Sequence, residues 1–425
     1  GDGTALERVW ESSTPPLQTL GVPVEHPAPG TPFFYPFPGL PAGPLEDLLF
    51  PSLLLFLSPS FRRLSECESK FSQYAMTAYH AMEVLPNTPK RVPCGTDDKK
   101  EGKLSMDVRR SRVVVVGTGH VGMTVVSTIV ANGLCNEVVL INRTPQRAQG
   151  EAMDLADGEE FFSRYTKIRV GDWSDCADAD IVIITAGARP IPGQSRLSEL
   201  GADIDIVDPI LKSVMASGFD GMLIMVSNPV DVLAWFAWKR TGLPSRQVIG
   251  TGTALDTARM KTIIAERTHL DPRTVGDYVI GEHGDSQFIP WSTVNIVGKP
   301  FARYLSDNAA KYPDVTLDGI EEAARRRGME IKALKGGTNY GIAATVAAIV
   351  KTILWDERRV MPVSTLIDGQ YSYDEHDVFL SLPVALDGDG VGDFVDLHLT
   401  DDEMARFHDS ARIVREHCAM IADRL

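Results

Sequence analysis

Two short segments of the chain carry polar side chains that could take part in acid–base chemistry. VIGEHGDS, residues 279–286, sets His283 between glycines after an apolar stretch. A histidine can move protons near neutral pH, although a single histidine in a turn is more often a surface residue. GTALDTAR, residues 252–259, supplies Asp256 and Arg259, which are three residues apart and therefore share one face of a predicted helix.

Two further segments are typical of ligand binding in α/β proteins. SNPVDVL, residues 227–233, places Asn228 at the end of an apolar strand, where such proteins bind their ligands. Gly117, Gly119 and Gly122 form a G-x-G-x-x-G pattern that follows one predicted strand, opens a helix and leads to a second strand. Glycines in this context let the backbone approach a pyrophosphate at the helix N-terminus, so we expect a dinucleotide cofactor.

The end of the second strand bears on the choice of cofactor. An acidic residue there would hold the adenosine ribose hydroxyls, but the sequence has Asn142 followed by Arg143. Asn142 could act as a neutral substitute in an NAD site. Alternatively, Asn142 would not repel a 2′-phosphate and Arg143 could pair with one, so NADP use stays open.

The elements that must position these residues alternate regularly from residue 110 onward. Apolar strands such as RVVVVGTG, EVVLIN, DIVIIT and GMLIMVSNP are separated by helical stretches, which predicts a doubly wound parallel sheet. We assign residues 110–253 to this NAD-binding Rossmann domain. Residues 254–425 mix helices near 254–268, 318–334 and 340–355 with strands such as DYVIGEH and MPVSTLIDG, and are assigned to an α+β catalytic and substrate-binding domain.

The C-terminal segment is predicted to be a helix. Thr400 and Glu403 have the spacing of a capping box. Apolar residues that recur at helical spacing predict core packing; they are Met404, Phe407, Ala411, Val414, Cys418 and Ile421.

Residues 1–109 differ in composition from the rest. They are rich in proline and glycine, lack a helical or strand period and include the charged stretch GTDDKKEGK, so we predict a disordered extension. Its longest apolar run, LLFPSLLLFL, is too short to span a bilayer. A targeting role for residues 1–105 stays open, although their acidic residues count against a typical organelle transit peptide.

Composition narrows the classes of partner and compartment. A net charge of −15 counts against nucleic acid and against an anionic membrane surface. It does not count against a small anionic substrate, which needs only one local arginine site. Five cysteines without C-x-x-C spacing predict reduced thiols and a cytoplasmic protein.

Residues 110–425 resemble the L-lactate/malate dehydrogenase family, and the lactate branch most closely. The resemblance is carried by VVVVGTGHVGM, GEAMDLADG, VSNPVDVLAW, VIGTGTALDTAR, YVIGEHGDS, KGGTNYGIA and VMPVS with DGQY. It implies an NAD-dependent L-2-hydroxy acid dehydrogenase, favouring lactate and pyruvate, that assembles as a homotetramer and needs no metal. Malate dehydrogenase and branched-chain L-2-hydroxy acid dehydrogenase activities are alternatives, and a non-catalytic cofactor-binding protein is a rival from another class.

The resemblance also implies roles for individual residues. His283 would be the proton donor, and Asp256 would orient it. Arg259 would hold the substrate carboxylate, Asn228 would bond the reacting oxygen, and Thr338 would line the pocket. The cofactor-binding residues implied are Gly117, Gly119, His120, Val121, Gly122, Asn142, Arg143, Thr185, Ala186, Gly187 and Asn228.

GARPIPGQSR, residues 187–196, resembles the mobile loop that closes over the substrate. Arg196 would polarise the substrate carbonyl as charge develops on oxygen. The substrate-selecting position, Gln in lactate enzymes and Arg in malate enzymes, is Pro190 here. Arg189 beside it could supply a malate-type contact. Asp203 stands where the family usually has Asn, which could alter loop or cofactor contacts.

Overall fold

The computed structural model describes residues 110–188, 196–370 and 373–425, with the backbone alone at residues 196 and 197. The predicted disordered extension, residues 1–109, lies outside this part of the chain. So do Arg189, Pro190 and the side chain of Arg196.

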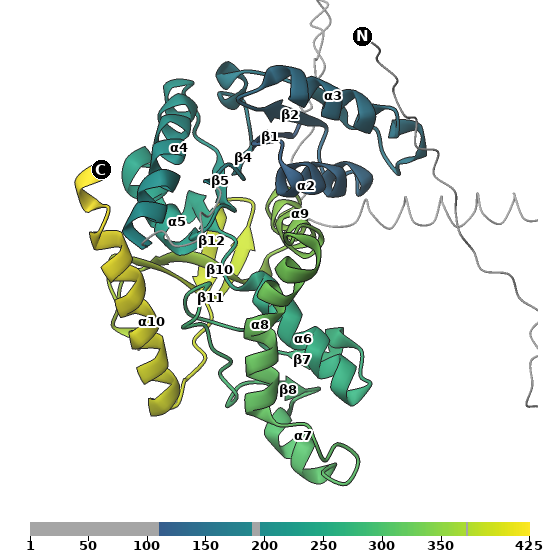
Figure 1. Ribbon diagram of the computed structural model, residues 1–425, viewed down its shortest axis with the longest axis vertical. Helices are drawn as coiled ribbons and strands as arrows, with labels where there is room; N and C mark the ends of the chain where they lie inside the picture. The colour runs from purple at the N-terminus through teal and green to yellow at the C-terminus, as the bar shows by residue number, and fades with distance from the viewer. Residues whose placement is uncertain (1–109, 189–195, 371–372) are drawn as a thin grey trace, which may run out of the picture. The chain divides into compact units, whose positions relative to one another are not determined.

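Six parallel strands form the centre of the fold, and β1, β2, β4 and β5 are the four that the sequence predicts. They lie in the order β6-β5-β4-β1-β2-β3, with Val114 of β1 opposite Val139 of β2 and Val182 of β4. The doubly wound α/β class is thereby confirmed (Figure 1). The strands are β1 (Arg112–Val116), β2 (Glu137–Ile141), β3 (Lys167–Val170), β4 (Ile181–Ile184), β5 (Met222–Met225) and β6 (Val248–Gly250).

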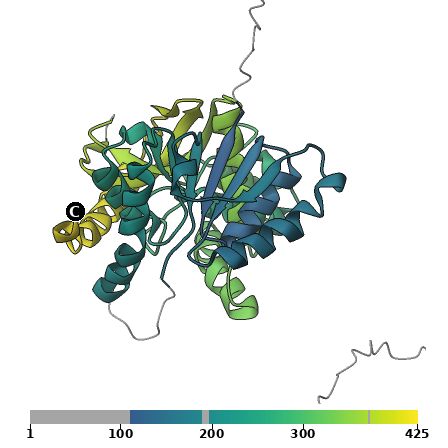
Figure 2. The same cartoon turned by 90° about the horizontal axis from the view of Figure 1, so that it is seen from above.

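Helices cover both faces of this sheet, because its strands are apolar on both sides (Figure 2). Val113 and Val115 share a core with α2, α3 and α9, whereas Val114 and Val116 share the opposite core with α4, α5 and α10. These helices are α2 (His120–Ala131), α3 (Pro145–Ala156), α4 (Arg196–Ala216), α5 (Val230–Thr241), α9 (Tyr340–Leu354) and α10 (Asp401–Ala419).

Three antiparallel strands extend the same sheet beyond β6. They are β10 (Arg359–Ile367), β11 (Val378–Asp387) and β12 (Gly390–Phe394), and β10 joins β6 through the pair Ser364–Gly250. The predicted strand MPVSTLIDG is thus confirmed as part of β10.

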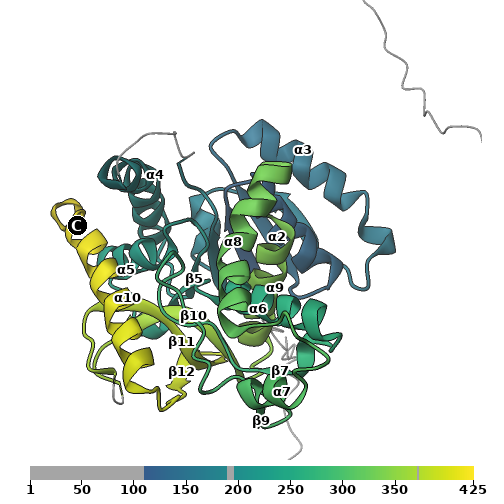
Figure 3. The same cartoon turned by 60° about the horizontal axis from the view of Figure 1, so that its bottom comes forward.

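A smaller group of elements packs around a third core. It contains α6 (Ala254–Thr268), α7 (Phe301–Asp307), α8 (Leu317–Lys335) and a sheet of β7 (Val275–Gly276), β8 (Asn295–Ile296) and β9 (Lys299–Pro300). Figure 3 shows α8 beside α6, and the two helices are in contact. The three helices expected after residue 250 therefore form as α6, α8 and α9.

DYVIGEH is not a strand, which corrects the sequence prediction. Asp277 has a φ of 85°, outside the extended region, and the backbone N–H of Val279 donates to the side chain of Thr257 at 2.9 Å. Single bridges tie Ile280 to Phe288 and Gly281 to Ser381. The segment is therefore an anchored loop held by isolated contacts.

The C-terminal helix forms as predicted. Thr400 and Glu403 make a reciprocal capping box at the start of α10. Phe407, Ala411, Val414 and Cys418 are buried in the core beside α4 and α5, which confirms the packing role of the apolar stripe. In the described segments, no helix is both long and apolar enough to cross a membrane.

Candidate active site

The glycine pattern lies in the turn between β1 and α2 and is shaped by close backbone contacts. Gly117 has a φ of 104°, a conformation that favours glycine, and a β-carbon there would lie 2.9 Å from Oγ1 of Thr185. A β-carbon on Gly122 would lie 1.9 Å from the carbonyl oxygen of Gly117. Gly117 and Gly122 therefore let strand, turn and helix approach one another.

Gly119 differs because it faces open space. A β-carbon there would meet nothing within 4 Å, and α2 begins at the next residue with neither a capping side chain nor an acidic residue in its first turn. Backbone N–H groups at a helix N-terminus attract phosphate. This turn fits the pyrophosphate of a dinucleotide, with His120 and Val121 in the first turn of the helix.

The end of β2 carries a hydrogen bond that bears on cofactor choice. Asn142 donates from Nδ2 to Oγ1 of Thr118 at 2.6 Å, and Thr118 is buried in the glycine turn. With its nitrogen engaged, Asn142 has its carbonyl oxygen left to accept a hydroxyl. The next side chain, Arg143, is exposed.

The residues after β4 are tied to the same end of the sheet. Thr185 donates to the carbonyl oxygen of Gly117 at 2.9 Å, and Ser227 donates to that of Ala186 at 2.7 Å. Beyond Gly187, the N–H of Ala188 donates to the Asp203 carboxylate at 2.8 Å. Asp203, which departs from the family pattern, thus anchors Ala188, the last described residue before residues 189–195.

His283, Asp256 and Arg259 form one connected cluster. Oδ2 of Asp256 lies 2.6 Å from Nδ1 of His283, and its Oδ1 accepts a hydrogen bond from Arg259 at 2.8 Å. The Asp256 side chain is only 2 % exposed, whereas that of His283 is 23 % exposed. The carboxylate is therefore buried between two partly accessible side chains, the imidazole of His283 and the guanidinium of Arg259.

Electrostatics in this cluster favour a charged pair. Burial alone would raise the pKa of Asp256, but the attraction of His283 and Arg259 outweighs it and lowers that pKa. Burial likewise opposes protonation of His283, yet Asp256 raises the pKa of the imidazole above its ordinary value. The arrangement keeps Asp256 ionised and stabilises imidazolium on His283.

The loop that carries His283 is fixed by buried contacts that sequence reasoning missed. The His283 N–H donates to Oδ2 of Asp231 at 2.7 Å, and the Glu282 N–H donates to Oγ of Ser410 on α10 at 2.7 Å. Asp231 lies in the quoted segment SNPVDVL, but its partner is 52 residues away in sequence. No local pattern could have paired them.

Gln287 is a second residue that sequence reasoning missed. It is buried beside Asp256. With its amide nitrogen turned toward the carboxylate, which satisfies both groups, that nitrogen lies 3.1 Å from Oδ2 and 3.3 Å from Oδ1. Asp256 then receives hydrogen bonds from three side chains.

The remaining predicted residues are less closely tied to this cluster. Asn228 is exposed just after β5, and Thr338 is half-buried in the turn between α8 and α9. No described contact joins either of them to His283. The carboxyl ends of β1, β4, β5 and β6 precede the glycine turn, Thr185, Asn228 and Asp256 respectively, so topology places these residues at one edge of the parallel sheet.

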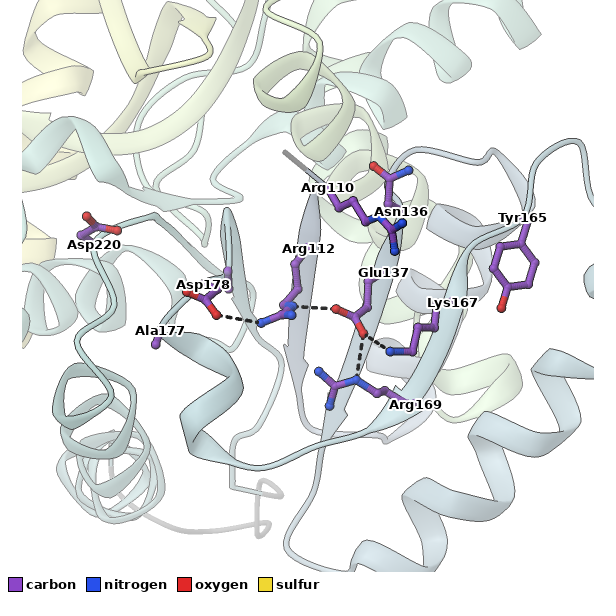
Figure 4. Close-up of a pocket in the computed structure, with 11 residues that line it drawn as sticks. Arg110, Arg112, Asn136, Glu137, Tyr165, Lys167, Arg169, Ala177, Asp178 and Asp220 are labelled. Carbon is purple, nitrogen blue, oxygen red and sulfur yellow. Dashed lines mark hydrogen bonds and ion pairs between the residues drawn. The ribbon is translucent and has the colours of Figure 1, made fainter. Parts of the chain in front are cut away.

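A separate cavity of about 1150 Å³ lies at the amino ends of the strands (Figure 4). Glu137 lies in the middle of the lining residues, and its carboxylate forms ion pairs with Arg112, Lys167 and Arg169 at 2.7 to 3.0 Å. These hydrogen bonds outweigh the opposing effect of burial and lower the pKa of Glu137 to about 2. This is an ion-pair network, and none of its residues belongs to the predicted site.

The fold and the cluster together define a class of protein. A glycine-rich turn at a helix N-terminus suits a dinucleotide, and a histidine–aspartate pair beside an arginine suits proton transfer to a small anion. Both features lie at the carboxyl edge of a parallel sheet. This combination defines a nicotinamide-dependent dehydrogenase of the α/β class.

Comparison with known proteins narrows this class to a family. Residues 111–250 match the lactate/malate dehydrogenase NAD binding domain, and residues 253–423 match the lactate/malate dehydrogenase alpha/beta C-terminal domain. The chain is 59 % identical over 311 residues to L-lactate dehydrogenase 1 of Bifidobacterium longum subsp. longum, covering 73 % of this chain and 98 % of that protein. It is 44 % identical over 310 residues to L-lactate dehydrogenase 3 of Bacillus cereus, with the same coverage of each.

Comparison with solved structures leads to the same family. The minor L-lactate dehydrogenase of Enterococcus mundtii, in its ligands-bound form, superposes with a TM-score of 0.70 at 38 % identity, over 74 % of this chain and 99 % of that one. The chain therefore belongs to the lactate/malate dehydrogenase family. It is an NAD-dependent oxidoreductase, as the sequence predicts.

Proposed function

We propose that the His283–Asp256–Arg259 cluster is the catalytic centre of an L-lactate dehydrogenase. The protein catalyses reversible hydride transfer between NAD(H) and a small L-2-hydroxy acid or 2-oxo acid. The observation that carries the assignment to these residues is the Asp256 carboxylate, which contacts His283 at 2.6 Å and Arg259 at 2.8 Å.

His283 is assigned as the proton donor in pyruvate reduction and the base in lactate oxidation. Its Nδ1 is engaged by Asp256, so Nε2 is the ring nitrogen left for the substrate oxygen. Buried Asp256 fixes the ring and offsets the imidazolium charge, much as an acidic partner does in other acid–base sites. The raised pKa of His283 keeps the proton available near neutral pH.

Arg259 is assigned to the substrate carboxylate. A planar guanidinium can make two parallel hydrogen bonds to a carboxylate, which fixes orientation as well as position. Asp256 holds one nitrogen of Arg259 and thereby aims the group. Asn228 is assigned to the reacting oxygen and Thr338 to the pocket wall.

The turn around Gly119 is assigned to the cofactor pyrophosphate, and Asn142 with Arg143 to the adenosine ribose. Thr185, Ala186 and Gly187, which follow β4 beside the glycine turn, are assigned to the same cofactor site. When bound, the nicotinamide supplies or accepts the hydride.

Pro190 and Arg196 are assigned to the substrate loop on the basis of sequence. Arg196 would stabilise developing negative charge on the substrate oxygen, and closure of the loop would exclude water. Pro190 has neither a charge nor a backbone N–H to offer a second carboxylate. We therefore propose pyruvate, or a slightly larger apolar 2-oxo acid, as the preferred substrate over oxaloacetate.

The test of substrate choice is steady-state kinetics on pyruvate, oxaloacetate and 2-oxoisocaproate. Wild type should favour pyruvate, and Pro190→Arg should raise efficiency with oxaloacetate and lower it with pyruvate. A charge-assisted contact is worth roughly 1.5–3 kcal/mol, about 10–150-fold in efficiency. A wild-type preference for oxaloacetate that Arg189→Ala abolishes would make the protein a malate dehydrogenase.

We further propose a homotetramer in the cytoplasm. Large apolar side chains are exposed on and after α3 (Met153, Phe161, Tyr165) and from α8 into α9 (Met329, Leu334, Tyr340), as expected of faces that other subunits cover. The described cysteines are unpaired and buried, which suits a reducing compartment. Light scattering on the purified protein and cell fractionation test these two points.

A further inference from the structure

Asp231 is a buried carboxylate that the assignments above leave unused. It lies in the first turn of α5 and is 2 % exposed. Its Oδ2 accepts the backbone N–H of His283 at 2.7 Å. Since burying a charge without full pairing is costly, this contact calls for an explanation.

The other carboxylate oxygen of Asp231, Oδ1, is buried without a hydrogen bond from the described residues. Ser364 of β10 faces the carboxylate, but among the described residues Oδ1 has no partner in hydrogen-bond geometry. Burial, reinforced by the nearby charge of Glu282, raises the pKa of Asp231 to about 7. A neutral asparagine could accept the same N–H without this cost.

We propose that Asp231 is a positioning residue for His283: it fixes the backbone of the histidine opposite Asp256 and adds a second negative charge that favours imidazolium. The proposal rests on the assignment of His283 as the proton donor. It explains why an acid, rather than an amide, occupies this buried position.

The geometry supports the positioning role. His283 is held from two directions, at the ring by Asp256 on α6 and at the main chain by Asp231 on α5. Small misplacements of a reacting group are costly, about 10²-fold for 1 Å. Asp231 thus links the strand end that carries Asn228 to the loop that carries the proton donor.

The charges around the pair determine the sign of the electrostatic effect. Asp256 from α6 and Asp231 from α5 both favour the protonated imidazole, and Arg259 from α6 opposes it. Around Asp231 itself, Glu282 of the loop opposes ionisation and His283 favours it. The charge of Asp231 also raises the pKa of the nearby Cys418 thiol on α10. Removing the charge of Asp231 should therefore lower the pKa of His283.

Asp231→Asn separates the two effects, because its amide oxygen can still accept the His283 N–H while the charge is lost. At saturating NADH, the alkaline fall of kcat/KM for pyruvate should move to lower pH by about 0.5–1 pH unit. The thermal midpoint at pH 8 should be unchanged or higher, since a carboxylate whose pKa is raised from 3.8 to about 7 destabilises the fold progressively as pH rises between these values, and fully at pH 8. Asp231→Ala should in addition lower kcat by about 10–100-fold.

Asp208→Asn is the matched control. Asp208 lies on α4 and pairs with Arg240 on α5, the helix that also carries Asp231. The variant therefore removes a carboxylate contact to α5 without touching the His283 loop. Its pH profile should match wild type. The rate at which diethyl pyrocarbonate modifies His283, followed against pH, gives the pKa of the imidazole without turnover.

An Asp231→Asn enzyme whose pH profile and modification profile both match wild type would overturn the proposal. Retained turnover in His283→Asn would instead overturn the assignment of the proton donor. The two failures are therefore distinguishable.

Discussion

Gly328, in the middle of α8, lies directly against the guanidinium of Arg259. A β-carbon on Gly328 would be 3.1 Å from Nη2 and 3.2 Å from Nη1 of Arg259. An interior helical glycine costs roughly 0.5–1 kcal/mol relative to alanine. Here the missing side chain makes room for the group assigned to the substrate carboxylate.

Gly328→Ala should therefore weaken substrate binding without lowering the stability of the fold. The added methyl must displace Arg259 by a few tenths of an ångström, so KM for pyruvate should rise about 3–10-fold while the thermal midpoint stays level or rises. Gly201→Ala on α4 is the control, because its β-carbon would meet nothing within 4 Å. An unchanged KM in Gly328→Ala would show that this contact does not position Arg259.

Gln287→Met should shift the pH profile in the direction opposite to Asp231→Asn. The amide of Gln287 shares the Asp256 carboxylate with His283, so its loss leaves more of that charge to the imidazole. The alkaline fall of kcat/KM for pyruvate should move to higher pH by about 0.3–0.5 pH unit. Shifts of the same sign in both variants would indicate general disruption of the loop.

Asn142→Asp should make the enzyme more selective for NADH over NADPH. The present asparagine offers a hydroxyl acceptor without repelling a 2′-phosphate, so we expect wild type to use NADPH within about 10³-fold of NADH. An aspartate would widen the gap by about tenfold or more through like-charge repulsion. If wild type already discriminates by more than 10³-fold, Arg143 makes no useful contact with a phosphate.

Glu137→Gln should destabilise the fold in a pH-dependent way. The pKa of Glu137 is lowered from 4.5 to about 2, so its stabilising effect is present above pH 4.5 and is lost as pH falls toward 2. We expect a loss of about 1–2 kcal/mol at pH 7, allowing for the partial exposure of its partners. Urea unfolding at pH 7 and pH 3.5 measures the gap between variant and wild type.

That gap should narrow at the lower pH. Asp178→Asn is the control, because Asp178 is 85 % exposed, lies 3.7 Å from Arg112 and should contribute little. A gap of equal size at both pH values would mean that Glu137 acts through packing rather than charge.

The sequence predicted the parallel sheet and the glycine turn because both are local patterns. A run such as RVVVVGTG shows strand, turn and helix start within a few residues, and the segments carrying His283, Asp256 and Arg259 resemble family motifs. DYVIGEH misled because Val279 and Ile280 are buried in two different cores, as strand residues often are, while the backbone makes only single contacts with Thr257, Phe288 and Ser381 instead of a ladder.

Residues that act across long sequence separations were not predictable in this way. Asp231 contacts His283 over 52 residues, and Gly328 faces a guanidinium on another helix. Gln287 follows His283 by only four residues, yet its role depends on the buried position of Asp256. The folded chain alone brings these partners together.

The most direct test of the account is the turnover of His283→Asn with pyruvate. This variant should bind NADH with wild-type affinity, measured by fluorescence, but lose about 10²–10⁴-fold in kcat because proton transfer is removed. In wild type, the raised pKa of His283 predicts that pyruvate reduction falls, and lactate oxidation rises, as pH increases through a value above the ordinary histidine pKa of about 6.5. Near-normal turnover in His283→Asn would contradict the assignment of His283 as the proton donor.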